Sequence, residues 1–143
     1  MVEFKLVIGT KNGKTYQKEI KSPEADALLK KNIGENIKGD ELGFSGYEFL
    51  ITGGSDKCGF PMRKGIQQPR KMGLIGKGVG FSGNKRPLGK KKTLRKQKGL
   101  VRRRTVCGEM ITKIIRQVNL KVVKEGAKSF EEAKEPEAKP ETK

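Results

Sequence analysis

Sixteen Lys and Arg side chains are concentrated between residues 63 and 108, with no Asp or Glu among them. Charges of one sign at this density repel one another, so ordering of the segment needs an external anion. A polyphosphate backbone suits it, because each cation placed on a phosphate also releases a condensed counterion. The predicted RNA-binding residues are Arg63, Lys64, Arg70, Lys71, Lys77, Lys85, Arg86, Lys90, Lys91, Lys92, Arg95, Lys96, Lys98, Arg102, Arg103 and Arg104.

The charge of the chain is arranged in blocks. Residues 1–62 carry nine basic and nine acidic side chains, residues 63–126 carry twenty and two, and residues 127–143 carry four and five. The total is the formal net charge of +17. We therefore expect the neutral first block to fold on its own, whereas the basic middle block depends on a partner.

The sequence contains few of the side chains that enzymes use for catalysis. The chain has no His, which removes Ser–His and Cys–His nucleophile pairs and the usual general base near neutral pH. Its two cysteines, Cys58 and Cys107, are too few for a zinc site and are expected to be free thiols. The sequence predicts a protein that is not an enzyme and has no catalytic residue, metal, cofactor or small-molecule substrate.

Two nucleotide-binding patterns are present only in part. Gly78, Gly80 and Gly83 fit the spacing G-x-G-x-x-G, but the first acidic residue afterwards is Glu109 and no helix is expected to open there. The spacing from Gly83 to Lys90 is one residue too long for a phosphate-binding P-loop. A Gly-rich loop lying against RNA is the better interpretation.

The expected mode of recognition follows from the scarcity of aromatic residues. Proteins that read single strands stack bases on aromatic side chains, and Phe81 is the only aromatic residue between positions 63 and 126. Recognition of folded RNA by shape and backbone fits better. No apolar run approaches the roughly 20 residues needed to cross a bilayer, so no membrane partner is expected.

The elements that position these cations begin with a predicted β-hairpin. Apolar residues alternate over 2–8, and a second strand follows over 15–20. A three-residue loop over 11–13 pairs Ile8 with Tyr16, Phe4 with Ile20 and Lys5 with Glu19, whereas a two-residue turn would mix the faces. We therefore expect the three-residue loop.

A short helix is predicted over 23–32, with Ser22 as its N-cap, Pro23 in the first turn and Gly34 closing it. A weak strand over 37–42 and a central, buried strand over 47–52 follow.

A glycine-rich run follows the central strand, from Ile51 to Met62. Its consecutive glycines permit close backbone approach, and Asp56 can accept hydrogen bonds from nearby N–H groups. Phe60 and Met62 can enter the core. A tightly turned structural loop is favoured over a phosphate-binding nest, and both remain open.

The basic stretch itself is expected to hold a brief strand over 72–75 and an extended excursion over 76–99 that is disordered until RNA binds it. Strands are predicted over 104–111 and 115–124, with a turn at 112–114. Arg102–Arg104 would form a phosphate clamp at the rim of the barrel. The tail, residues 127–143, has one large apolar side chain and is expected to be disordered.

The run over 51–62, with the spacing Gly-Gly-x-Asp-x-x-Gly-x-Pro-Met, resembles the signature of a ribosomal protein family, protein six of the small subunit in its eukaryotic and archaeal form. Lys77-Gly78, Arg102–Arg104 and the segment 119–126 resemble that family in the same order. The resemblance spans about residues 1–126. It implies a small, mainly β barrel and a structural, rRNA-binding role in the small subunit of the cytoplasmic ribosome, beside neighbouring ribosomal proteins.

The resemblance is to the shorter, archaeal form. Eukaryotic members continue into a long basic helical extension with phosphorylated serines, whereas this sequence has an acidic-leaning tail after Gly126. Regulation by phosphorylation is therefore not carried over.

Together these features predict a mainly β protein: a small β-barrel with one short α-helix and a basic, Gly-rich extended loop. Residues 1–126 would form one domain that includes the rRNA-binding excursion at about 76–99. The predicted function is structural, in translation, with small-subunit rRNA as the ligand. The alternative is a free-standing RNA-binding or RNA-chaperone protein.

Overall fold

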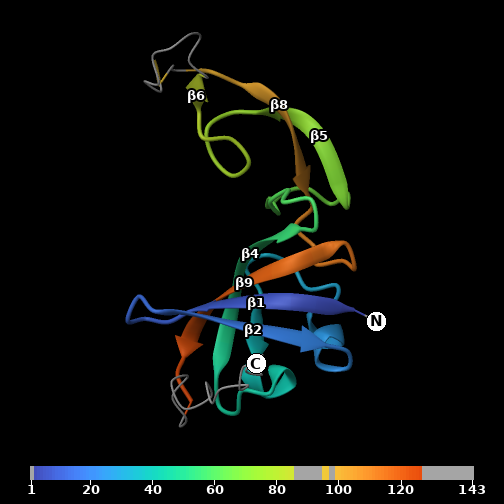
Figure 1. The fold of residues 1–143 in the computed structure, drawn as a ribbon, viewed down its shortest axis with the longest axis vertical. Coiled ribbons are helices and arrows are strands. Elements are labelled where there is room, and N and C mark those ends of the chain that lie inside the picture. Colours follow the sequence, from blue (N-terminus) through green and yellow to red (C-terminus); the bar gives the residue numbers. More distant parts are fainter. Residues whose placement is uncertain (1, 86–94, 97–98, 127–143) are drawn as a thin grey trace, which may run out of the picture.

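A computed structural model describes residues 2–85, 95–96 and 99–126, and in these the fold is mainly β (Figure 1). A five-stranded sheet has the order β2-β1-β9-β4-β3, and two ribbons pair β5 with β8 and β6 with β7. The elements are β1 Glu3–Gly9, β2 Thr15–Lys21, η1 Glu24–Leu28, β3 Asn36–Lys38, η2 Gly39–Leu42, β4 Glu48–Asp56, β5 Arg70–Ile75, β6 Asn84–Lys85, β7 Arg95–Lys96, β8 Arg102–Cys107 and β9 Ile115–Lys124.

The first hairpin has the predicted register. Ile8 pairs with Tyr16, Phe4 with Ile20 and Lys5 with Glu19. The Thr10 N–H donates to the Lys14 carbonyl at 2.9 Å and leaves residues 11–13 as the loop. Gly13 has φ +79°, the left-handed conformation that this loop requires at its last position.

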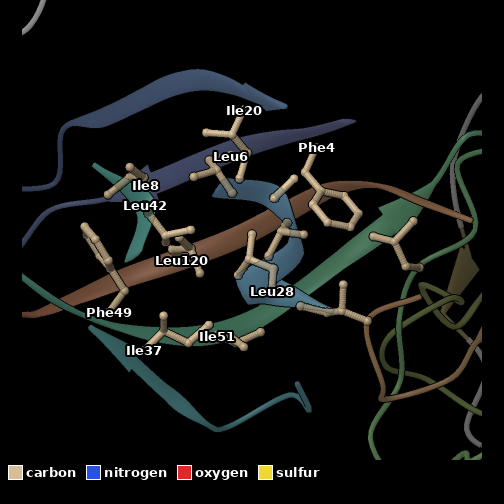
Figure 2. Packing of buried hydrophobic residues seen from close by; sticks show 14 of the residues in the cluster. Phe4, Leu6, Ile8, Ile20, Leu28, Ile37, Leu42, Phe49, Ile51 and Leu120 are labelled. Carbon is tan, nitrogen blue, oxygen red and sulfur yellow. The ribbon is translucent and has the colours of Figure 1, made fainter. Parts of the chain in front are cut away.

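The sheet curls around its core and stays open between β2 and β3, which do not pair in the described residues. The predicted mainly β fold is confirmed, and the predicted small β-barrel takes the form of a curled half-barrel. The reason lies in the 3₁₀ helices: η1 packs on β2, η2 packs on β3, and the two contact each other. Their Leu28 and Leu42 join Phe4, Phe49 and Leu120 in the core (Figure 2). These helices therefore fill the space that further strand pairing would need.

The predicted α-helix over 23–32 is wrong. The segment forms a five-residue 3₁₀ helix, η1, in which Ser22 is not the cap and no side chain caps the first turn. Ala25 and Leu28 are both fully buried, since residues three apart align on one side of a 3₁₀ helix. Beyond it, the Lys30 N–H donates to the Ile111 carbonyl at 3.0 Å. This long-range pairing uses a donor that a longer helix would have needed.

The two strands predicted over 37–42 and 47–52 are present with different bounds. The first is only β3, because the chain turns into η2 at Gly39. The second, β4, is an interior strand of the sheet, in keeping with the predicted central position, and lies between β9 and β3, but it runs on to Asp56. It is buried chiefly on one face, since Phe49 and Ile51 are fully buried and Leu50 is half-buried. A Cβ on Gly54 would collide with the Gln117 carbonyl of β9, so the predicted close approach at this glycine is confirmed.

The last two long strands separate instead of returning together. β9 lies in the middle of the sheet, parallel to β1 and antiparallel to β4. β8 pairs with β5 in a ribbon that stands away from the sheet along the long axis of the molecule (Figure 1). We call residues 63–108 the arm, and β1–β4, β9, η1 and η2 the sheet unit.

The arm has a small core of its own. Ile75, Phe81 and Val106 are buried in it, with Ile66 and Leu100 packed against them. Within the predicted excursion, β6 and β7 pair, so at least this part is regular. Residues 86–94 and 97–98 of the excursion, and the predicted disordered tail over 127–143, lie outside the described residues.

In the part of the chain that is described, no helix has the length and apolar character required to span a membrane.

Candidate nucleic-acid interface

Half of the sixteen predicted RNA-binding side chains are described, and all eight lie on the arm. Arg63 and Lys64 stand at its root, Arg70 and Lys71 begin β5, Lys77 follows β5, and Arg102–Arg104 begin β8. The backbone of Lys85, Arg95 and Lys96 lies in the β6–β7 ribbon. The remaining predicted residues, Arg86, Lys90, Lys91, Lys92 and Lys98, lie outside the described residues.

Most of these eight cations face water without an acidic neighbour. Lys64, Lys71, Lys77, Arg103 and Arg104 are exposed. Within the described residues, Arg70 is the member of this group that forms a salt bridge. Among the described side chains, the fold therefore leaves the charge of these five exposed cations without an acidic partner, and an anion can approach them.

The position of Arg102–Arg104 differs from the predicted clamp at the barrel rim. These residues are the first half of β8 and pair with Ile75, Leu74 and Gly73 of β5. Successive side chains of a strand point to opposite faces, so Arg103 faces away from Arg102 and Arg104. The three arginines therefore do not converge on one phosphate.

Phe81, the single aromatic residue of the basic stretch, is 7% exposed. It packs on Ile75 and Val106, and the Arg102 guanidinium carbon lies 6.0 Å from its ring centroid. The ring is thus used inside the arm and offers no platform for a base. Recognition through phosphates and shape agrees with this geometry.

The Gly78–Gly83 segment is a structural turn. Gly78 and Phe81 exchange backbone hydrogen bonds of 2.8 and 3.1 Å. Gly80, at φ +92°, passes so close to Val106 that a Cβ would lie 2.9 Å from its Cγ1. The turn leads into the strand β6, whereas the dinucleotide fingerprint requires a helix to begin there. Its glycines allow Phe81 to fold back onto the ribbon.

The root of the arm is anchored by Asp56, at the end of β4. Its Oδ1 accepts the N–H groups of Cys58 at 2.8 Å and Phe60 at 2.9 Å, as the sequence predicted. Its Oδ2 accepts Arg70 Nε at 2.8 Å and the Cys107 thiol at 3.3 Å. One carboxylate thus joins β4, the following loop, β5 and β8. These N–H groups are occupied by Asp56, which favours the structural loop over the phosphate nest.

This arrangement changes the role of one predicted site residue. Arg70 pairs with Asp56, donates from Nη2 to Cys58 Sγ at 3.3 Å and lies 5.3 Å from the Phe60 ring centroid. Its charge is compensated inside the protein, unlike that of Lys71. The sequence held a signal for the acidic partner, because Asp56 is the only acidic residue between Glu48 and Glu109, but nothing in it singled out Arg70 among the sixteen cations.

The contacts around Asp56 shift the pKa values of two groups, Asp56 itself and the Cys107 thiol. Burial acts to raise the pKa of Asp56, but hydrogen bonds from Phe60, Cys107 and Arg70 outweigh it, and the pKa lies below its ordinary value. Burial, together with the hydrogen bond to Asp56, raises the pKa of the Cys107 thiol to about 11. Both cysteines are free thiols, with Cys58 exposed and Cys107 buried. Cys107 is therefore a neutral donor in the core.

No group of three or more His, Cys, Asp or Glu side chains that could hold a metal ion occurs in the described ranges 2–85, 95–96 and 99–126.

Comparison with known proteins identifies relatives along almost the whole chain. The family model of ribosomal protein S6e matches residues 4–135. The small ribosomal subunit protein eS6 of Methanococcus maripaludis is 41% identical over 126 residues, which is 87% of this chain and 90% of the relative. The proteins of the same name from Methanoculleus marisnigri and Archaeoglobus fulgidus are 37% and 40% identical over 134 residues, 92% of this chain and 92% and 95% of theirs.

Proposed function

The chain belongs to the ribosomal protein S6e family, and from this premise we propose that it is a structural constituent of the small ribosomal subunit that binds folded rRNA through the arm. It then works in the cytoplasm, as part of the ribosome, beside other small-subunit proteins. Its role is to hold RNA segments in place, and no chemical step is assigned to it.

One observation carries the proposal: the arm is free of acidic residues, and its exposed cations have no acidic partner within the described residues. Binding of RNA to such a surface is favourable, because each cation placed on a phosphate releases a condensed counterion. The sheet unit serves as the anchor. Its large core holds the root of the arm in place and so determines where the positive charge is presented.

The contact surface includes the cations that face water. Lys71 and Arg104 lie on one face of the β5–β8 ribbon, because Lys71 pairs with Val106 and Gly73 pairs with Arg104 in the same register. Lys64 and Lys77 extend the charge toward the root and toward β6. Arg70 is excluded from this surface by its pairing with Asp56.

Binding of small-subunit rRNA, measured over a range of salt concentrations, tests the proposal. A Lys71→Gln/Arg104→Gln variant should bind all rRNA fragments more weakly. Its plot of log affinity against log salt should be shallower by about 1.5 units, since each phosphate contact contributes roughly 0.7–0.9. The matched control, Lys11→Gln/Lys121→Gln, removes two exposed charges from the sheet unit. If both variants change the slope equally, binding follows net charge and the arm is not the interface.

Sedimentation separates the proposal from the free-standing RNA-binding or chaperone alternative. A small-subunit constituent should stay with small subunits through a moderate-salt wash, because RNA and protein contacts surround it. A free-standing binder should wash off and exchange with added RNA. Recovery of the wild-type chain only in the unbound fraction would reject a structural role in the subunit.

A further inference from the structure

The two faces of the β5–β8 ribbon differ in what covers them. On one face, Ile75 and Val106 are 4% and 1% exposed, because the turn that carries Phe81 folds back over them. On the other face, Met72 and Leu74 are 63% and 70% exposed. One side of the ribbon thus has an apolar cover within the chain, and the other side has none in the described residues.

The uncovered side forms a continuous strip. Met72 and Leu74 are two residues apart on β5 and share a face. Leu74 pairs with Arg103 of β8, and Val101, two residues before Arg103, is 52% exposed. Val101 Cγ1 lies 3.8 Å from where a Cβ on Gly76 would be, beside the end of β5. We call Met72, Leu74 and Val101 the apolar strip, and adjoining apolar side chains of this kind mark contact surfaces.

We propose that the apolar strip docks an apolar segment of a neighbouring protein, with an acidic side chain of that segment opposite Arg103. The inference rests on the proposed function, in which the chain sits among other small-subunit proteins. It adds that the ribbon has an RNA side and a protein side.

The chemistry of the strip favours protein over RNA. Aliphatic side chains cannot replace the water lost by phosphates and ribose hydroxyls, so pressing RNA onto the strip would desolvate polar groups without compensation. Bases stack on aromatic rings, and the aromatic ring of the arm, Phe81, lies on the opposite face. Apolar side chains of a protein match the strip directly.

The charge within the strip specifies the partner further. Arg103 is exposed and has no acidic partner in the described residues. Placed among Leu74 and Val101, its guanidinium would be partly desolvated on docking, and a carboxylate is the group that compensates it best. Arg103 and Arg104 are neighbours in sequence but face opposite sides, so they contact different partners.

The first test compares naked rRNA with assembled subunits, using the full-length chain. A Met72→Thr/Leu74→Thr variant removes the apolar surface and keeps residues that favour a strand. Val79→Thr, at a residue of the same arm that is 54% exposed but outside the strip, is the matched control. The double variant should bind naked small-subunit rRNA within twofold of wild type. On subunits from cells in which it is the only copy, it should dissociate about tenfold faster or more in high salt.

A second test uses the neighbouring arginines and a photo-crosslinker. Arg104→Gln should shallow the salt slope on naked rRNA, whereas Arg103→Gln should leave it unchanged and weaken retention on subunits. A photoreactive residue at position 74 of subunit-bound chain should cross-link to protein, and one at position 71 should cross-link to rRNA. Unchanged thermal unfolding of each variant, followed by circular dichroism, shows that the fold is kept.

Other outcomes overturn the inference. Equal loss of naked-rRNA binding by the double variant, or an RNA cross-link from position 74, would mean that the strip faces RNA. A wild-type dimer in sedimentation that Leu74→Thr dissociates would mean that a second copy covers the strip. Subunit retention equal to wild type would mean that nothing docks there. Each leaves the proposed function intact, whereas failure of the wild-type chain to bind rRNA or subunits overturns both.

Discussion

The sheet unit and the arm are stabilised by different means. Within the described residues, eighteen buried side chains form the core cluster centred on the sheet unit, whereas three form that of the arm. The first 62 residues balance their charges, whereas the arm carries sixteen cations and no acid. Apolar burial is therefore a large stabilising contribution in the sheet unit. With three buried side chains in its described part and an uncompensated positive charge, the arm depends on its root for stability, and the RNA partner proposed above would supply the missing anions.

The junction shows how the two regions are joined. Cys107, the last residue of β8, is fully buried in the core of the sheet unit, and its N–H donates to the Pro61 carbonyl at 2.9 Å. Asp56 adds the charged contact, through Arg70. The root of the arm is therefore held by both apolar burial and a charged contact, which fixes where the arm leaves the sheet unit.

The largest expected difference between the regions comes from their aromatic core residues. Phe49→Ala should lower the free energy of unfolding by about 3–5 kcal/mol, since it leaves a cavity in the main core. Phe81→Ala should lower the global value by less than about 1 kcal/mol, because the arm opens without unfolding the sheet. Denaturant unfolding followed by circular dichroism measures both. Equal losses would show that the arm and sheet unit unfold as one unit.

Removing the charge of Asp56 tests the junction. Asp56→Asn keeps an oxygen for the Cys58 and Phe60 N–H groups but turns an amide donor toward Arg70 and Cys107. We expect a loss of about 2–3 kcal/mol in the free energy of unfolding, together with faster hydrogen exchange in β5 and β8. Arg70→Gln should cost less than Asp56→Asn, because its side chain is 42% exposed and water screens its charge. A larger cost for Arg70→Gln would contradict Asp56 as the central anchor.

The pH dependence of stability should report the same carboxylate. The pKa of Asp56 is lowered in the folded state, so its contribution is complete above the unfolded value of about 4 and is lost as pH falls through the folded value. The chain has no His, so no side chain with an ordinary pKa near neutrality adds to the curve. Unfolding of wild type and Asp56→Asn, measured from pH 7 downward, should converge in acid. Parallel curves would rule out this linkage.

A smaller change in stability is expected when either of two glycines with similar backbone geometry is replaced. Gly13 in the hairpin and Gly99 in the arm have φ of +79° and +72°, and neither has an atom within 4 Å of an added Cβ. Alanine at either should cost about 1 kcal/mol locally. Gly13→Ala should lower global stability by that amount, whereas Gly99→Ala should affect only exchange within the arm. Equal effects on global unfolding would remove the distinction between the regions.

Local patterns predicted the features that short-range geometry decides. The hairpin register follows from alternation over 2–8 and from the loop ending at Gly13, since only one loop length keeps the apolar faces together. The turn at Asp56 follows from a carboxylate within reach of N–H groups two and four residues ahead. In both cases the interacting groups are close in sequence.

Long-range competition produced the errors. The α-helix predicted over 23–32 does not form. The Lys30 N–H instead donates to the carbonyl of Ile111, about eighty residues away along the chain, and η1 packs against η2. Arg70 resembled every other cation of the basic stretch until the fold placed it beside Asp56. Periodicity and composition carry no information on which distant groups meet.

By itself, the sequence determined that this chain is mainly β, that one stretch is a polycation without acids, and that a signature run near Asp56 links it to a ribosomal family. These properties reside in composition and local spacing. Tertiary structure alone decided that β8 leaves the sheet to pair with β5, that Arg70 is neutralised, and that Arg103 and Arg104 face opposite ways. Strand pairing and burial depend on contacts between distant residues, whose choice is settled by the free energy of the whole fold.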